Sequence, residues 1–304
     1  MKALLYLALL SSLIIFGCSE DDENINTPPA TSSLTLNING LEDLGASAMY
    51  EGWIIVPTPG ANKPAADTPI STGTFSVNSS GQLSKTTFEI DTDNLNSATA
   101  FVLTIEPVPD NDPAPSAVHI LAGDFTANAA ALSVGHGAAL GDAFAAAAGK
   151  YILATPTNGA NTDENSGIWF LDLSSGTPAQ GLQLPTLPNG WVYEGWTVIN
   201  GTPVTTGTFT STTMVDDADP FSSTQGGPPF PGEDFLVNAP TGLTFPTNIA
   251  GGTAVISIEP SPDNSPNPFT LKPLVAAIPT NAVDHETYMM NLNLGSFPTG
   301  AATR

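Results

Sequence analysis

Four glutamates in repeated sequence blocks are the residues best suited to acid–base chemistry. Glu51 and Glu194 each lie in the tetrapeptide Tyr-Glu-Gly-Trp, and Glu106 and Glu259 each follow an apolar run in Ile-Glu-Pro. Two carboxyl groups held roughly 5–10 Å apart form the acid–base pair of a glycosidase. Two equal active sites in one chain are uncommon, so we expect these glutamates to accept hydrogen bonds and to fix strand register instead.

Metal chemistry would need histidines or loop carboxylates. His119, His136 and His285 have no second histidine or cysteine at zinc-ligand spacing, so no transition-metal site is predicted. Calcium suits the loop aspartates better because it prefers hard oxygen ligands, although no EF-hand spacing is present and aspartate is also common in turns. The candidate calcium ligands are Asp91, Asp93, Asp110, Asp112, Asp216, Asp217 and Asp219.

Other catalytic signatures are absent from the sequence. It contains no Gly-x-Ser-x-Gly elbow, no phosphate-binding Walker loop and no dinucleotide fingerprint. Trp53, Trp169, Trp191 and Trp196 could stack on sugars, but a tryptophan repeated at equivalent positions is more typical of a core anchor. We therefore predict a protein that is not an enzyme, with a hydrolase as the enzyme class left open, and no cofactor apart from the calcium alternative.

Cys18 is the only cysteine of the 304 residues, and it follows an apolar segment. Lys2 precedes the segment Ala3–Phe16, which would cover roughly 21 Å as a helix, short of the ~30 Å hydrocarbon core. This pattern is typical of a signal peptide. The stretch Leu13–Cys18 resembles a bacterial lipobox, with Phe16 bulkier than usual. The resemblance implies cleavage before Cys18 and its lipidation; an ordinary signal peptide with an incidental cysteine is the alternative.

A serine and four acidic residues follow Cys18. This cluster resembles the surface-export signal of Bacteroidota lipoproteins, which implies an outer-membrane lipoprotein on the cell surface; a solvated acidic tether is the alternative. Residues 1–17 are thus predicted to be the signal peptide, and residues 18–33 a lipidated, acidic and proline-containing linker. The predicted export-signal residues are Ser19, Glu20, Asp21, Asp22 and Glu23.

The charge balance limits the partners. The formal net charge is −23, with only six lysines and arginines, and charged residues make up 12% of the chain, about half the usual share. Nucleic acid and anionic lipid headgroups both need clustered cations, so neither is a predicted partner. The predicted partners are the membrane, through the Cys18 anchor, and an unidentified envelope protein or extracellular glycan.

Three blocks recur in the same order, which predicts an internal duplication. Insertions fall between them: copy 1 has the longer loop at Pro57–Pro69, and copy 2 has the longer loop at Met214–Thr247. Such loops are natural recognition surfaces. The repeat-motif residues, predicted to be structural, are Tyr50, Glu51, Gly52, Trp53, Gly73, Phe75, Glu106 and Pro107 in copy 1, and Tyr193, Glu194, Gly195, Trp196, Gly207, Phe209, Glu259 and Pro260 in copy 2.

Short runs rich in β-branched and aromatic residues, separated by turn-forming residues, predict an all-β protein. We expect two tandem β-sandwich-like domains over residues 34–160 and 166–304. The Ala-rich run 126–150 predicts a short helical insertion in the first domain. A single pseudo-symmetric protein built from both copies is the alternative.

The order Tyr-Glu-Gly-Trp, Thr-Gly-Thr-Phe, Ile-Glu-Pro and Pro-Asp-Asn resembles the extracytoplasmic domain of anti-sigma-K-factor-like (RskA-type) membrane proteins. Copy 1 matches it over roughly residues 36–125, and copy 2 matches in patches. The resemblance implies a β fold outside the cytoplasm and brings no catalytic residue. The N-terminal stretch is predicted to be consumed by export, which argues against sigma binding.

These observations together predict a cell-envelope lipoprotein that displays two related, non-catalytic β domains for binding or structural roles outside the cytoplasm. One alternative is a glycan-binding or glycan-processing surface component, which would need exposed tryptophans and paired carboxylates. Another is an envelope signalling component related to anti-sigma factors but without the sigma-binding part.

Overall fold

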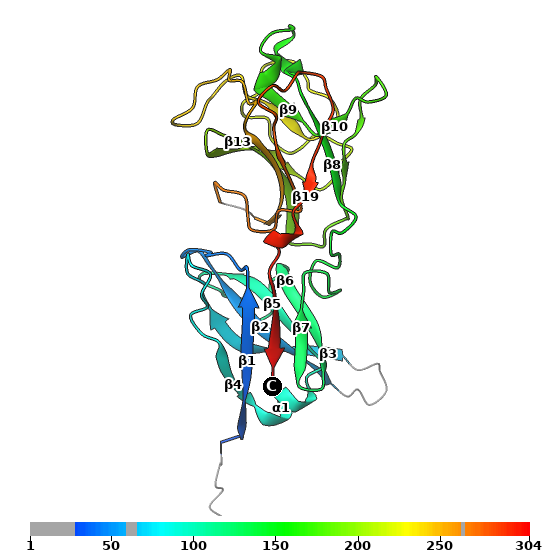
Figure 1. Cartoon of the computed structure of the whole chain (residues 1–304). Helices are drawn as coiled ribbons and strands as arrows, with labels where there is room; N and C mark the ends of the chain where they lie inside the picture. Colours follow the sequence, from blue (N-terminus) through cyan, green and yellow to red (C-terminus); the bar gives the residue numbers. More distant parts are fainter. Residues whose placement is uncertain (1–27, 59–65, 263–264) are drawn as a thin grey trace, which may run out of the picture.

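The computed structural model describes residues 28–58, 66–262 and 265–304. The chain is nearly all β, as predicted, and forms two lobes placed end to end (Figure 1). The lower lobe contains β1–β7 and β20, and the upper lobe contains β8–β19. The predicted signal peptide, Cys18 and the acidic cluster lie outside the described residues. Within the described ranges, no helix is long and apolar enough to cross a membrane.

The lower lobe is one eight-stranded antiparallel sheet in the order β3-β2-β5-β6-β7-β20-β1-β4. Leu34, Leu36 and Ile38 of β1 are buried between exposed neighbours, the alternation of a strand with one face on the core. Its strands are β1 (Thr31–Asn39), β2 (Ala48–Thr58), β3 (Ala66–Phe75), β4 (Thr87–Asp91), β5 (Ala100–Pro107), β6 (His119–Thr126), β7 (Ala129–Leu132) and β20 (Thr299–Thr303).

The upper lobe contains one sheet in the order β14-β13-β16-β17-β19 and a second in the order β12-β8-β9-β15, to which β18 adds by pairing with β8. A small ribbon of β10 and β11 completes it. Its strands are β8 (Ala148–Leu153), β9 (Gly167–Trp169), β10 (Leu171–Asp172), β11 (Ala179–Gln180), β12 (Leu182–Gln183), β13 (Trp191–Ile199), β14 (Thr202–Phe209), β15 (Gly232–Asp234), β16 (Thr253–Pro260), β17 (Leu274–Ala277), β18 (Tyr288–Met289) and β19 (Asn291–Leu292).

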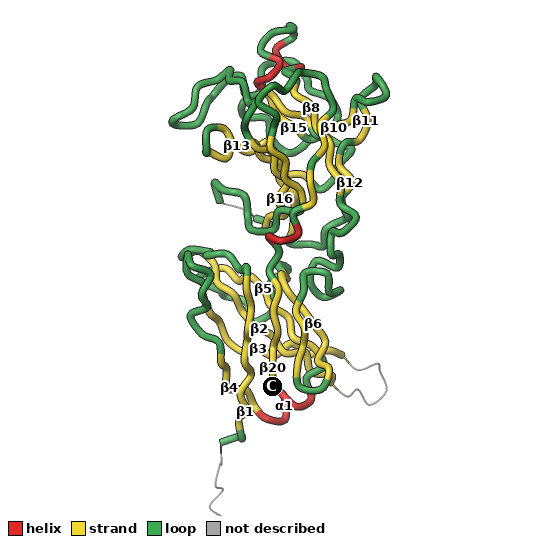
Figure 2. The backbone as a smooth tube through the Cα atoms, in the orientation of Figure 1, coloured by secondary structure: helices red, strands yellow, loops and turns green. Residues whose placement is uncertain are grey.

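Within the described residues, helical structure is confined to short pieces, drawn in red in Figure 2. Asp91 caps the N-terminus of the one α-helix of the described chain by accepting a hydrogen bond from the Asn94 amide. The pieces are α1 (Thr92–Ser97) and the 3-10 turns η1 (Pro156–Asn158), η2 (Glu164–Ser166) and η3 (Leu294–Ser296).

Strand pairing crosses the expected domain limits of 34–160 and 166–304 twice. β8 pairs with β9 and β12 of the upper lobe, and β20 pairs with β1 and β7 of the lower lobe. The lobes are also joined by packing, because Phe144 and Phe297 meet edge to face at 5.5 Å and the Thr270 amide donates to Glu42 Oε2 at 2.6 Å. One cluster of buried apolar side chains includes residues of both lobes.

The helical insertion expected within residues 126–150 is wrong. The first part of this Ala-rich run forms β7, in which Ala130 and Leu132 are buried and alternate with exposed alanines. Turns follow, in which Gly141 and Phe144 adopt positive φ values of 76° and 57° that a right-handed helix does not allow. Alanine favours helices by at most a fraction of a kcal/mol over other residues, and pairing with β20 and β6 outweighs that preference here.

Candidate functional site

The two repeated blocks fold into the same three-stranded unit. β2 lies between β3 and β5 in the lower lobe, and β13 lies between β14 and β16 in the upper lobe. Tyr50 pairs with Phe75, and Tyr193 pairs with Phe209; the two rings stack at 5.6 Å in each case. The repeated sequence thus specifies repeated structure, while the origin of the repeat by duplication stays a prediction.

A glycine at the same place in each unit permits a β-bulge. The register shifts directly after Gly52 and directly after Gly195. A Cβ on Gly52 would lie 2.5 Å from Thr72 Oγ1, and one on Gly195 would lie 2.2 Å from Thr206 Oγ1. Neither position has room for a side chain, which explains why glycine precedes tryptophan in both blocks.

In the lower lobe, Trp53, Thr104 and Glu106 form a polar chain that ends on a loop. Trp53 Nε1 donates to Thr104 Oγ1 at 2.9 Å, and that hydroxyl donates to Glu106 Oε1. The same carboxylate oxygen accepts from the Ser116 amide at 2.9 Å, ten residues further along the chain. Glu106 is 2% exposed and therefore fastens the proline-rich loop to the sheet.

The upper lobe repeats this chain with Trp196, Ser257 and Glu259. Trp196 Nε1 donates to Ser257 Oγ at 2.9 Å, and Ser257 donates to Glu259 Oε1. The Phe269 amide, again ten residues on, donates to the same oxygen at 2.8 Å. Both Ile-Glu-Pro glutamates are thus occupied by their own neighbours rather than free for acid–base work.

Glu51 and Glu194 are occupied in the same way. Ser71 donates to Glu51, and Thr205 donates to Glu194. Burial raises the pKa of Glu51, and the negative charges of Glu106 and Asp110 add to the rise. Glu51 is 8% exposed and Glu194 is 5% exposed, so neither carboxyl is open to a substrate.

The sugar-stacking role proposed for tryptophan finds no platform in the structure. Trp53, Trp169, Trp191 and Trp196 are all between 2% and 4% exposed. Buried tryptophans anchor the core, and a sugar could not reach their faces.

Replacing either motif tryptophan with phenylalanine should destabilise the protein by about 1–3 kcal/mol, because one buried hydrogen bond is lost and a small void remains. Urea denaturation of Trp53→Phe and Trp196→Phe would measure this loss. Val237→Ala, at a position 41% exposed, serves as the control and should change little. An unchanged midpoint for both tryptophan variants would contradict an anchoring role.

The candidate calcium ligands bind their own backbone instead of gathering. Asp110 and Asp112 each accept from the amide two residues ahead, and Asp217 accepts from the Thr208 amide and hydroxyl. Asp91 caps α1, and Asp216 accepts from an amide of β15. Across residues 28–58, 66–262 and 265–304, no group of three or more His, Cys, Asp or Glu side chains could hold a metal ion.

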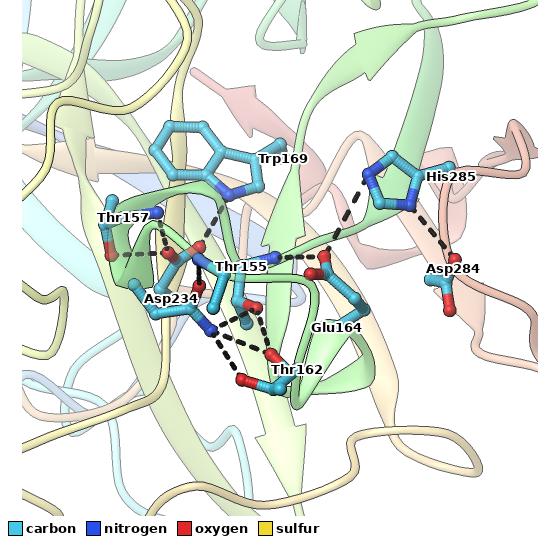
Figure 3. A network of polar contacts seen from close by, with 10 residues as sticks. Thr155, Thr157, Thr162, Glu164, Trp169, Asp234, Asp284 and His285 are labelled. Carbon is cyan, nitrogen blue, oxygen red and sulfur yellow. Dashed lines mark hydrogen bonds and ion pairs between the residues drawn. The ribbon is translucent and has the colours of Figure 1, made fainter.

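His119 and His136 both contact the backbone of Ala138, but within the described residues they belong to no group of three side chains that could hold a metal ion. His136 Nε2 is 3.3 Å from Asp124, and His119 Nδ1 contacts the Ala138 carbonyl at 2.8 Å. His285 Nδ1 is 3.0 Å from Asp284 Oδ1 in the upper lobe (Figure 3).

Sequence reasoning missed two fully buried acids of the upper lobe, Glu233 and Asp234 of β15, both 0% exposed. Asp234 accepts hydrogen bonds from Trp169 Nε1 at 2.8 Å and from the amide and hydroxyl of Thr157 at 2.8 and 2.5 Å (Figure 3). The Gly-Glu-Asp sequence, set among prolines, reads as a solvated turn, so no local signal indicates this burial.

Two acids in or beside β15, Asp216 and Glu233, have strongly raised pKa values. Burial raises the pKa of Asp216 to about 8, against the lowering effect of a hydrogen bond from the Gly232 amide. Burial likewise raises the pKa of Glu233 to about 7, although Ser222 donates to it. No cation pairs with either carboxyl in the described structure, so deprotonation at high pH would leave buried negative charge.

A polar recess of about 410 Å³ opens beside η2 in the upper lobe. A smaller one of about 220 Å³ lies beside Met214 and Val215, which are 61% and 58% exposed. Both recesses border the predicted recognition loop Met214–Thr247, at its two ends. The first is lined among others by Asn161, Asp163, Glu164, Thr247, Asn248 and Asp284.

No protein-family model, curated protein or solved structure matches this chain. The resemblance to the extracytoplasmic domain of RskA-type proteins therefore stays a prediction.

Proposed function

We propose that this protein is an exported lipoprotein, anchored through Cys18, that holds a non-catalytic binding surface away from the membrane. The observation that carries the proposal is that the start of the described chain and the polar recess lie at opposite ends of the molecule. The described residues begin at the lower end of the lower lobe, just before β1, whereas the recess beside η2 lies at the opposite end of the molecule (Figure 1).

The linker length agrees with this orientation. Between Cys18 and Thr31 the chain could span at most roughly 45 Å if fully extended. An anchor at Cys18 would thus tether the lower lobe near the bilayer, and the upper lobe would face outward. The net charge of −23 would also disfavour contact of the lobes with anionic headgroups.

Binding fits the site chemistry better than catalysis does. The four motif glutamates are held by internal hydrogen bonds, and the recess beside η2 is lined mainly by carboxylate, amide and hydroxyl side chains. Such a surface accepts more hydrogen bonds than it donates, so it suits a ligand rich in N–H and O–H donors. The burial of the tryptophans counts against a glycan site that depends on stacking.

Cleavage on intact cells tests the outward display. One specific protease site would be inserted at the turn of Gly176 in the upper lobe, and a second site at the turn of Gly81 in the lower lobe. Both glycines have open space around their Cα. We expect protease added to intact cells to cut both sites. Cutting only after the outer membrane is permeabilised would overturn surface display.

A further inference from the structure

β20 lies inside the lower sheet although the whole upper lobe separates it from the other lower strands along the chain. It pairs with β1 from Thr35–Thr303 to Asn39–Thr299 and with β7 from Ala129–Thr303 to Leu132–Gly300. The drawing shows β20 in red between β1 and β7 (Figure 1).

β20 contributes mainly backbone hydrogen bonds to the lower sheet. Of its five residues only Ala302 is buried, at 0% exposure, so β20 adds little apolar surface to the core. Removing it would leave unpaired amides and carbonyls along both β1 and β7, in the middle of the sheet. The lower lobe is therefore incomplete until β20 arrives.

Arg304 fastens the end of β20. Its guanidinium donates to the carbonyls of Leu95 and Ala98 at 2.6 and 2.7 Å, and its carbon lies 4.4 Å from the centre of the Phe125 ring. These carbonyls belong to the C-terminal end of α1, where backbone acceptors lack partners within the helix. β20 is thus held both by its ladder and by this clamp.

We propose that insertion of β20 into the lower sheet is the last step of folding. The lower lobe therefore stays incomplete until the upper lobe has formed. If the chain is exported N-terminus first, β1 to β7 cross the membrane before β20; this step rests on the function proposed above. The upper-lobe strands pair over shorter sequence separations than β1 and β20 do, so they close first. The lower lobe, next to the anchor, is completed only by a chain whose upper lobe is already outside.

Refolding of the purified mature chain from urea, followed by pulsed hydrogen exchange, tests the order without any export. We expect amides in the β13–β16 ladder to become protected about tenfold faster than those that β1 and β7 share with β20. Protection of the β20 ladder at the same time as the β13–β16 ladder, or before it, would overturn the proposal. The anchor plays no part in this experiment, so its outcome is separate from that of the proposed function.

Gly300→Val blocks the insertion itself. A Cβ at Gly300 would lie 2.5 Å from the Asn37 carbonyl oxygen and 2.8 Å from Ile38 Cα. We expect amides of β1 and β7 to lose protection by at least about 100-fold while the β13–β16 ladder keeps its own. Gly295→Ala, five residues before Gly300 and with open space around it, is the control and should change neither. Retained protection of β1 and β7, or equal loss in both lobes, would overturn the proposal.

Discussion

Replacing Asp234 with alanine is expected to lower the free energy of unfolding by about 3–5 kcal/mol. The carboxylate is 0% exposed and receives three hydrogen bonds, one from Trp169 and two from Thr157. Alanine would leave these donors buried without a partner, and each such donor costs about 1–3 kcal/mol. The loss would be measured as a lower urea midpoint.

Asp219→Ala provides the matched control, because Asp219 is an exposed aspartate of the same loop region. Its midpoint should stay within about 0.5 kcal/mol of the parent value. A parent-like midpoint for Asp234→Ala would show that the buried network of Figure 3 does not hold the upper lobe together.

The protein is expected to lose stability as the pH rises from about 4 to about 8. Asp216 and Glu233 have folded-state pKa values raised by burial to about 8 and about 7, above the ordinary values of 3.8 and 4.5. The folded state therefore binds these protons more tightly than the unfolded state does. Their stabilising effect is complete below the ordinary values and disappears as the pH passes the raised ones.

Urea midpoints at pH 5.0 and pH 8.5 measure this dependence of stability on pH. Asp216→Asn isolates the contribution of Asp216, whose pKa is raised the more of the two. The amide keeps the shape but cannot ionise, so the variant should show a distinctly smaller fall between the two pH values. A parent protein that is equally stable at both would contradict the burial of these acids. Asp219→Asn, at an exposed position, should keep the parent dependence.

The repeated blocks were the part of the fold most open to prediction. Tyr50, Gly52 and Trp53 recur as Tyr193, Gly195 and Trp196 because each performs the same task of stacking, bulging or donating into the core in both units. The repetition of these residues in the sequence is what made their structural role predictable. The structural role expected of Glu106 and Glu259 likewise follows from their fixed distance to the loop that each one fastens.

Other features depend on distant partners that no repeated motif marks in the sequence. The short, small-residue stretch Thr299–Thr303 carries no sign that it will pair with β1, more than 250 residues earlier. Asp234 is buried by Thr157 and Trp169, which belong to a different segment. In the Ala-rich run, a local helix preference was overridden by such a distant partner, β20.

Metabolic labelling with a clickable fatty acid tests the central claim most directly, because the proposed lipid on Cys18 would decide where the protein is held and which way it faces. The parent chain should take up the label and sediment with membranes, whereas Cys18→Ser should do neither. A labelled Cys18→Ser variant, or an unlabelled parent chain in the cytosol, would contradict the account.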